Sequence, residues 1–139
     1  MKNNVERIVK HLEMTQVVMN RMGRNSFQLK GWSMTILVAA KVLIARTDLP
    51  SPFLILALIF PIIGFWFLDG YFIRQERLFR HIYDDVRKQS DTNFEMNVAK
   101  HKSKSNCKWR AIFFSIVLGS FYGVEVVFTI VVFAVIYCG

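Results

Sequence analysis

Residues 111–138 read AIFFSIVLGSFYGVEVVFTIVVFAVIYC, and Glu125 is the one charged residue among them. A helix needs about 20 mostly apolar residues to cross a bilayer, so this stretch is long enough to do so. An ionisable group at the centre of a bilayer is costly and is usually paired, hydrated or functional. The stretch therefore predicts a transmembrane helix. The role of Glu125 within that helix has to be explained.

Two more apolar stretches precede this one. Residues 31–47 contain Lys41 near their middle, and residues 53–73 contain Asp69 near their end. The first stretch is short for a span and crosses only if its ends snorkel; the alternative is a buried helix in a soluble core. Because 53% of only 139 residues are hydrophobic, a soluble domain of this size could not bury them all. We expect an all-α integral membrane protein with three transmembrane helices.

The basic residues predict the orientation of the chain. Nearly all Lys and Arg residues lie in residues 1–30 and 74–110, whereas the link between the first two spans carries only Arg46. Because cytoplasmic loops are enriched in Lys and Arg, the N-terminus is predicted in the cytoplasm and the C-terminus outside a bacterial inner membrane. In that topology Cys107 and Cys138 lie on opposite sides and cannot bridge.

Residues 1–30 are predicted to form a cytoplasmic amphipathic helix. Apolar or small residues recur at a spacing of three or four, which is typical of a heptad seam; they are Val5, Ile8, Leu12, Thr15, Met19 and Met22. We expect this helix to end near Gly23. The seam has two interpretations, self-association of several copies or packing on the membrane or on the protein's own cytoplasmic helix.

Residues 74–110 are predicted to continue the second span as a cytoplasmic helix to about residue 88, followed by a basic loop. One face is expected to pack on the N-terminal helix; its members are Leu68, Phe72, Gln75, Phe79, Ile82 and Val86. The opposite face is either a solvated surface or an anion site for a nucleotide or oligonucleotide; its members are Arg74, Arg77, Arg80, His81 and Lys88. At the membrane boundary, Lys30 is expected to pair with Asp69.

Lys41 and Glu125 are predicted at similar depth on the first and third spans. Three interpretations stay open: a direct pair within or between chains, an anion-preferring path lined by Lys41, and a proton relay through Glu125. A pair that closes a pore would combine the first two. The GxxxG at Gly119 and Gly123 would allow close helix packing beside Glu125. Three helices cannot enclose a pore alone, so a pore requires an oligomer.

No phosphate loop, nucleophile motif, carboxylate dyad or metal-ligand spacing occurs in the sequence, so we expect neither an enzyme nor a cofactor. Residues 11–87 resemble small bacterial membrane proteins of unassigned function. The resemblance rests on these stretches: His11–Leu12–Glu13–Met14, Arg21–Met22, Asn25–Ser26–Phe27, Leu29–Lys30–Gly31–Trp32, Phe65–Trp66–Phe67–Leu68–Asp69–Gly70–Tyr71–Phe72 and Arg74–Gln75–Glu76–Arg77–Leu78–Phe79–Arg80. The third span follows only in hydropathy.

In plan, these proteins are similar to the small transmembrane effectors of anti-phage operons, with the Hailong-type effector as the nearest family and cyclic-nucleotide effectors as the rival. The resemblance implies an oligomeric anion channel, held closed by oligodeoxyadenylate from a partner nucleotidyltransferase and opened during infection. The predicted function is therefore a homo-oligomeric ion channel, with a tetramer as one candidate, in which Lys41 and Glu125 form the pore or gate. The alternative is a structural or regulatory membrane subunit that docks a partner protein through its cytoplasmic helices.

Overall fold

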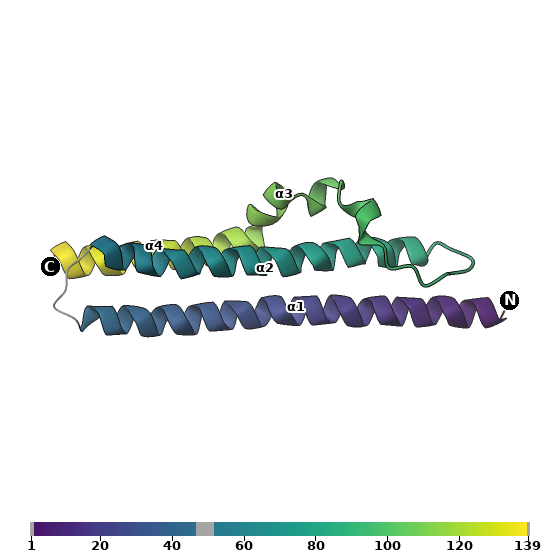
Figure 1. Cartoon of the computed structure of the whole chain (residues 1–139), viewed down its shortest axis with the longest axis horizontal. Helices are drawn as coiled ribbons and strands as arrows, with labels where there is room; N and C mark the ends of the chain where they lie inside the picture. Colours follow the sequence, from purple (N-terminus) through teal and green to yellow (C-terminus); the bar gives the residue numbers. More distant parts are fainter. Residues whose placement is uncertain (1, 47–51, 139) are drawn as a thin grey trace.

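The protein is built from helices joined by turns, without strands in the part that the structure describes. The computed structural model describes residues 2–46 and 52–138. Its elements are α1 (Lys2–Ala45), α2 (Pro52–Val86), η1 (Val98–His101), η2 (Ser105–Cys107), α3 (Trp109–Phe113) and α4 (Ile116–Cys138). In Figure 1, α1 and α2 lie side by side and antiparallel, and α4 lies along the half of α2 that leads from the α1–α2 link. The predicted all-α architecture is confirmed.

α1 is one helix from Lys2 to Ala45. The predicted helix end near Gly23 is therefore wrong, and the N-terminal helix and the first apolar stretch are not separate elements. A Cβ at Gly23 would lie 3.9 Å from Glu76 Oε2 on α2. A single glycine costs about 1 kcal/mol in a helix interior, and packing along α2 outweighs that penalty. Thr47, the predicted end of the first span, lies outside the described residues.

The seam of α1 packs on the protein's own α2. Buried or half-buried α1 positions continue along the whole helix; they include Ile8, Leu12, Thr15, Met19, Met22, Leu29 and Leu37. Val5, predicted as the first seam residue, is 60% exposed and lies outside it. The seam had been interpreted either as self-association of several copies or as packing within the chain or on the membrane. In the structure it packs on α2 of the same chain.

α2 continues through Pro61 to Val86, close to the predicted end at about residue 88. Its buried face differs from the predicted one near the middle of the helix. Leu68 is exposed, while Asp69 is fully buried beside it. Farther along, Ile82 and Val86 are buried as expected. The difference arises because Asp69 has polar partners on two other helices, which the spacing of apolar residues could not indicate.

The third apolar stretch is broken, contrary to the prediction of one helix over residues 111–138. α3 ends at Phe113, Phe114 leaves the helical conformation (φ −95°, ψ 16°), and α4 begins at Ile116. Phe113 packs against Trp66 and Phe67, with ring centroids 6.0 Å apart in both pairs. A Cβ at Gly70 would lie 3.0 Å from Phe113 Cε1, so the glycine allows this close approach. Aromatic packing on α2 therefore fixes α3 as a separate element.

The bundle has two ends of different character. We call residues 31–46, 52–73 and 116–138 the apolar half, and residues 2–30 and 74–113 the polar half. Three helices are long and apolar enough to cross a membrane, over Asn3–Ile44, Ala57–Val86 and Ile116–Val135. Only 22–28% of the residues in their most apolar windows are buried. The core is small and lies mostly in the apolar half; it comprises Leu37, Leu58, Ile62, Ile112, Leu118, Tyr122 and Phe133.

Candidate functional site

Lys41 of α1 and Glu125 of α4 line the same groove in the apolar half. The groove has a volume of about 650 Å³ and runs between the two helices, which make few contacts with each other. Lys41 is 5% exposed and Glu125 is 8% exposed, so both lie deep in it. The helical spacing places Lys30, Lys41 and Met34 on one wall, opposite Glu125 and Phe128. Lys41 and Glu125, which were predicted at similar depth on the first and third spans, therefore lie in the same groove.

The two charges attract each other but form no ion pair within the described part of the chain. The Lys41 ammonium lies 4.6 Å from the centroid of the Phe128 ring, which is a cation–π contact. Glu125 Oε2 is buried and has no hydrogen-bond partner among the described residues. A direct pair inside one chain, one of the predicted arrangements, is therefore not formed. A buried carboxylate oxygen without a donor calls for water, another chain or a proton.

Lys30 also lines the groove, at the end nearer the polar half. Its Nζ lies 2.5 Å from Asp69 Oδ2 on α2, so the predicted pair does form. Lys30 Nζ donates to Ser26 Oγ at 2.9 Å, and Ser26 Oγ donates in turn to Asp69. Tyr122 of α4 donates to Asp69 Oδ2 at 3.3 Å. This Asp69 cluster ties α1, α2 and α4 together at one end of the groove.

Sequence reasoning missed Ser26 and Tyr122 as members of this cluster. Ser26 lies four residues before Lys30, on the same helix face, which was a usable signal. Tyr122 is the residue before Gly123 in an otherwise apolar stretch, and its hydroxyl needed a partner once buried. Neither position identifies Asp69 as that partner without the three-dimensional structure.

The predicted anion site does not assemble as one surface. Arg74 Nε donates to the Cys107 carbonyl at 2.9 Å, and Arg77 donates to the Asn106 carbonyl at 2.9 Å. His81 Nε2 lies 3.0 Å from Asn106 Oδ1. These three side chains hold η2 against α2, and the Arg74 guanidinium also covers the ring of Trp109, the first residue of α3, at 4.8 Å.

The other two predicted members lie elsewhere. Arg80 pairs with Glu76 on its own helix at 2.7 Å. Lys88 follows the end of α2 and is exposed. Arg74, Arg77 and His81 form the attachment surface of α2 for the returning chain, residues 105–109, and the anion site over all five residues stays a prediction. Carbonyl oxygens of that chain take the donors that were assigned to a ligand.

Comparison with known proteins adds no assignment. No protein-family model, no curated protein and no solved structure matches this chain. Function is therefore inferred from the groove, the Asp69 cluster and the polar half.

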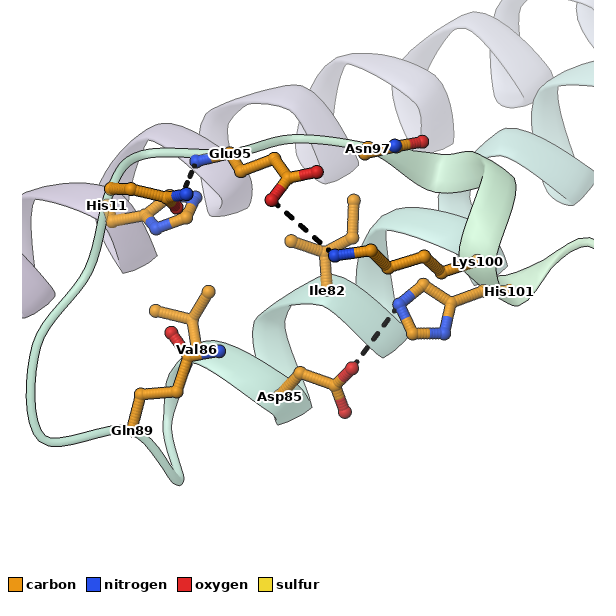
Figure 2. Close-up of a pocket in the computed structure, with 10 residues that line it drawn as sticks. His11, Ile82, Asp85, Val86, Gln89, Glu95, Asn97, Lys100 and His101 are labelled. Carbon is orange, nitrogen blue, oxygen red and sulfur yellow. Dashed lines mark hydrogen bonds and ion pairs between the residues drawn. The ribbon is translucent and has the colours of Figure 1, made fainter.

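A small polar cavity of about 70 Å³ lies at the far end of the polar half, between α1, α2 and η1 (Figure 2). His11 and His101 line it from different elements. His101 Nε2 lies 3.4 Å from Asp85 Oδ2. Burial lowers the pKa of His101, and the Asp85 carboxylate offsets this only in part. Among the described residues, no three His, Cys, Asp or Glu side chains are grouped as metal ligands.

Cys107, whose carbonyl accepts a hydrogen bond from Arg74 on α2, has a fully buried thiol. Burial raises the pKa of its thiol, although Arg77 and Arg74 nearby favour the thiolate. A raised thiol pKa and full burial both make a cysteine unreactive. The side chain of Cys138 lies outside the described part of the structure.

Proposed function

We propose that three helices of this protein span a bacterial inner membrane and that several copies assemble into an ion channel. One observation carries the proposal. Lys41 and Glu125, the charges in the middle of the apolar half, both open into the groove between α1 and α4 without pairing there. Buried charges at membrane depth that line a cavity are typical of ion paths. The groove would form part of the pore wall.

The distribution of charge supports an orientation with the N-terminus in the cytoplasm. The polar half contains most of the basic residues, and the net charge of the chain is +8. At the boundary, Phe67 and Trp109 stack with ring centroids 5.4 Å apart. Phe114 and Ile116 beside them are 79% and 88% exposed. An aromatic stack next to exposed apolar residues suits the interface between headgroups and acyl chains.

The geometry of one chain supports the proposal that several copies assemble. Three helices leave the groove open on one side and cannot surround a water-filled path by themselves. A Cβ at Gly119 or Gly123 of α4 would meet nothing within 4 Å, so among the described residues no helix of the same chain packs on the GxxxG. A second copy packing on that face would bring backbones close together. A homo-oligomer, with a tetramer as one candidate, would close the path.

Anion preference is the selectivity that the groove suggests. Lys30 and Lys41 are long basic side chains on its wall, whereas Glu125 is the one acidic side chain there and one of its oxygens is enclosed by protein. Rings of Lys or Arg in an oligomeric pore favour anions. Lys41 would act as the selectivity residue and Glu125 as a gate residue that holds it when the pore is closed.

Control by a nucleotide or oligonucleotide in anti-phage defence stays a prediction from the resemblance. With Arg74, Arg77 and His81 bound to the chain itself, an anion ligand would have to use other cations of the polar half. Lys88 and the lysines after η1 are exposed and remain available, whereas Arg80 is paired with Glu76. Binding that weakens as salt is added would be the signature of such a site.

The experiment is conductance of the purified protein in a planar bilayer, with reversal potentials in a salt gradient. We expect the wild type to conduct with anion preference and Lys41→Gln to shift the reversal potential toward cations. Lys102→Gln, an exposed lysine of the polar half, is the matched control and should leave the reversal potential unchanged. A silent wild type, or a Lys41→Gln variant with unaltered selectivity, contradicts the proposal.

A second function is supported by one feature of α1. Val5, Val9 and Val17 are exposed on its polar part, where no lipid would cover them in the proposed orientation. Apolar side chains left on a polar surface suit a partner protein, so the chain would be a membrane subunit that docks a partner. A silent wild type in the bilayer experiment would favour this function.

A further inference from the structure

A clasp joins the segment after α2 to the first turns of α1. We define it by Arg7, His11, Asp91, Thr92 and Phe94. Arg7 donates to the Thr92 carbonyl at 2.6 Å and pairs with Asp91 at 3.0 Å. His11 Nδ1 lies 2.6 Å from Thr92 Oγ1, and its ring lies 5.5 Å from that of Phe94. The clasp holds residues 87–97 against the N-terminal end of the molecule.

η1 continues this attachment on the side of α2. His101 Nε2 contacts Asp85, and the His101 ring stacks on His81 with centroids 5.6 Å apart. Figure 2 shows His11 and His101 on opposite sides of the small cavity, with Ile82 and Asp85 of α2 beneath them. Residues 87–104 are therefore fastened at two points, and each point contains a histidine.

Both histidines are buried with one ring nitrogen unpaired. His11 is 1% exposed and His101 is 6% exposed. His11 Nε2 and His101 Nδ1 have no hydrogen-bond partner among the described residues. A neutral imidazole carries one N–H, and protonation adds a second N–H together with a full charge. A buried charge whose new donor finds no acceptor is unfavourable. The state in which residues 87–104 are fastened to α1 and α2, which we call the closed segment, therefore favours neutral rings.

The surrounding charges do not reverse this preference. Near His11, Arg7 on the same helix is paired with Asp91, and burial is what lowers the pKa of His11. Glu95, which also lines the cavity, pairs with Lys100 at 3.5 Å. Around His101, Asp85 attracts a proton, whereas His81, Lys100 and Lys104 repel it. Asp85 is the single close carboxylate at His101, and it is outweighed by burial.

We propose that acidification releases residues 87–104 from α1 and α2, because the closed segment holds His11 and His101 neutral. When the segment opens, both rings meet water and accept protons at their ordinary affinity. The open state therefore binds more protons than the closed state, and the equilibrium shifts toward opening as the pH falls. Phe94, which the closed segment holds at a φ of 60°, also relaxes on opening.

The size of the effect follows from proton linkage. Each histidine kept neutral changes the ratio of open to closed molecules by up to about tenfold per pH unit below its open-state pKa of about 6.5. Two histidines acting together give up to about a hundredfold per pH unit. Segment opening would free the N-terminal turns of α1 in the same step.

The test is hydrogen exchange of the full chain in lipid nanodiscs between pH 7.5 and 5.5, with rates corrected for the intrinsic effect of pH. We expect protection of amides in residues 87–104 to fall by about tenfold or more. Protection around Asp69, in the middle of α2, should stay constant and serves as the internal reference. An unchanged protection in residues 87–104 overturns the proposal.

Variants assign the effect to the two rings. His11→Asn keeps a polar group near Thr92, and His101→Gln keeps a donor near Asp85, but neither titrates. We expect each variant to reduce the pH dependence and the double variant to abolish it. Lys10→Gln, which removes an exposed charge next to His11 on α1, is the control and should retain it. A double variant with the wild-type pH dependence overturns the proposal.

A separate measurement covers variants that fail to close at neutral pH. The ring signals of the wild-type protein can be followed by NMR during a pH titration. His11 and His101 should remain neutral at pH 6 while residues 87–104 are closed. Protonation of both at their ordinary pH without segment opening overturns the proposal, whatever the variants do.

Discussion

At the scale of single residues, Asp69 shows how a charge inside an apolar stretch can be stabilised. Its side chain is fully buried, and its partners Ser26, Lys30 and Tyr122 come from two other helices. Lys41 and Glu125 lack such a set of partners. Asp69, with three partners, stabilises the packing of the helices. Glu125, whose Oε2 is unpaired in the groove, can still bind an ion, water or another chain.

Asp69→Asn should destabilise the bundle strongly. Removing one partner of a buried ion pair typically costs about 3–5 kcal/mol, because the other charge is left uncompensated. Tyr122→Phe removes one hydrogen bond from the same carboxylate and should cost about 1 kcal/mol. Denaturant unfolding in micelles, followed by circular dichroism, measures both.

The control for this prediction is Glu76→Gln. Glu76 forms an ion pair with Arg80 on the surface of α2, and such exposed pairs contribute about 0–1 kcal/mol. If Asp69→Asn lowers the free energy of unfolding no more than Glu76→Gln does, the Asp69 cluster does not stabilise the bundle as this prediction requires.

At the scale of elements, the basic face of α2 attaches the returning chain. Arg74 and Arg77 each donate to a carbonyl of residues 106–107, and Arg74 also covers Trp109. This attachment places α3 at the boundary between the two halves and encloses Cys107. The position of α3 therefore depends on side chains that a sequence pattern assigns to a ligand.

Arg74→Ala should expose Cys107 to thiol reagents. In the wild type, burial and the raised pKa of Cys107 should make alkylation slow. Loss of the Arg74 contacts should speed alkylation at neutral pH by about tenfold or more, since local opening then becomes easier. Peptide mass spectrometry distinguishes Cys107 from Cys138. Arg80→Ala, on the same helix but outside the attachment surface, is the control and should leave the rate unchanged.

Part of the arrangement of the helices could be predicted from the sequence. Apolar periodicity predicted the length of α2 and the packing of α1 on it, because a long amphipathic face is determined locally. It could not predict that α1 continues past Gly23 or that α3 separates from α4. Both features depend on packing against α2, along the whole of α1 in the first case and of Phe113 at Gly70 in the second.

The same limit applies to the candidate site. Topology alone predicted that Lys41 and Glu125 lie at similar depth and that Lys30 pairs with Asp69. It could not predict whether Lys41 and Glu125 touch, since this depends on the rotation of two helices about their axes. It also assigned Arg74 and Arg77 to a ligand, because the sequence does not reveal which backbone carbonyls return to α2.

At the scale of the whole molecule, one chain leaves most of its apolar half uncovered. Less than a third of the residues in the most apolar windows are buried. Lipid can cover the outward faces, but lipid cannot satisfy Glu125 in the groove between α1 and α4. A group of copies around a common axis would cover some of these faces and turn the groove toward water.

The Gly119→Leu and Gly123→Leu double variant should reduce the size of this assembly. A Cβ at either glycine would meet no described atom within 4 Å, so helix content and monomer stability should persist. Between copies, the added bulk would keep α4 from close helix contact. Native mass spectrometry from micelles would then detect smaller species than for the wild type.

Gly64→Leu is the matched control, because Gly64 lies on α2 in the apolar half and is equally open. Its assembly should match that of the wild type if contact between copies is specific to α4. Equal loss of assembly in both variants would mean that any added bulk disturbs the oligomer. A monomeric wild type would remove the oligomer itself, and the groove would then have to be closed by lipid or by a partner protein, since one chain cannot enclose it.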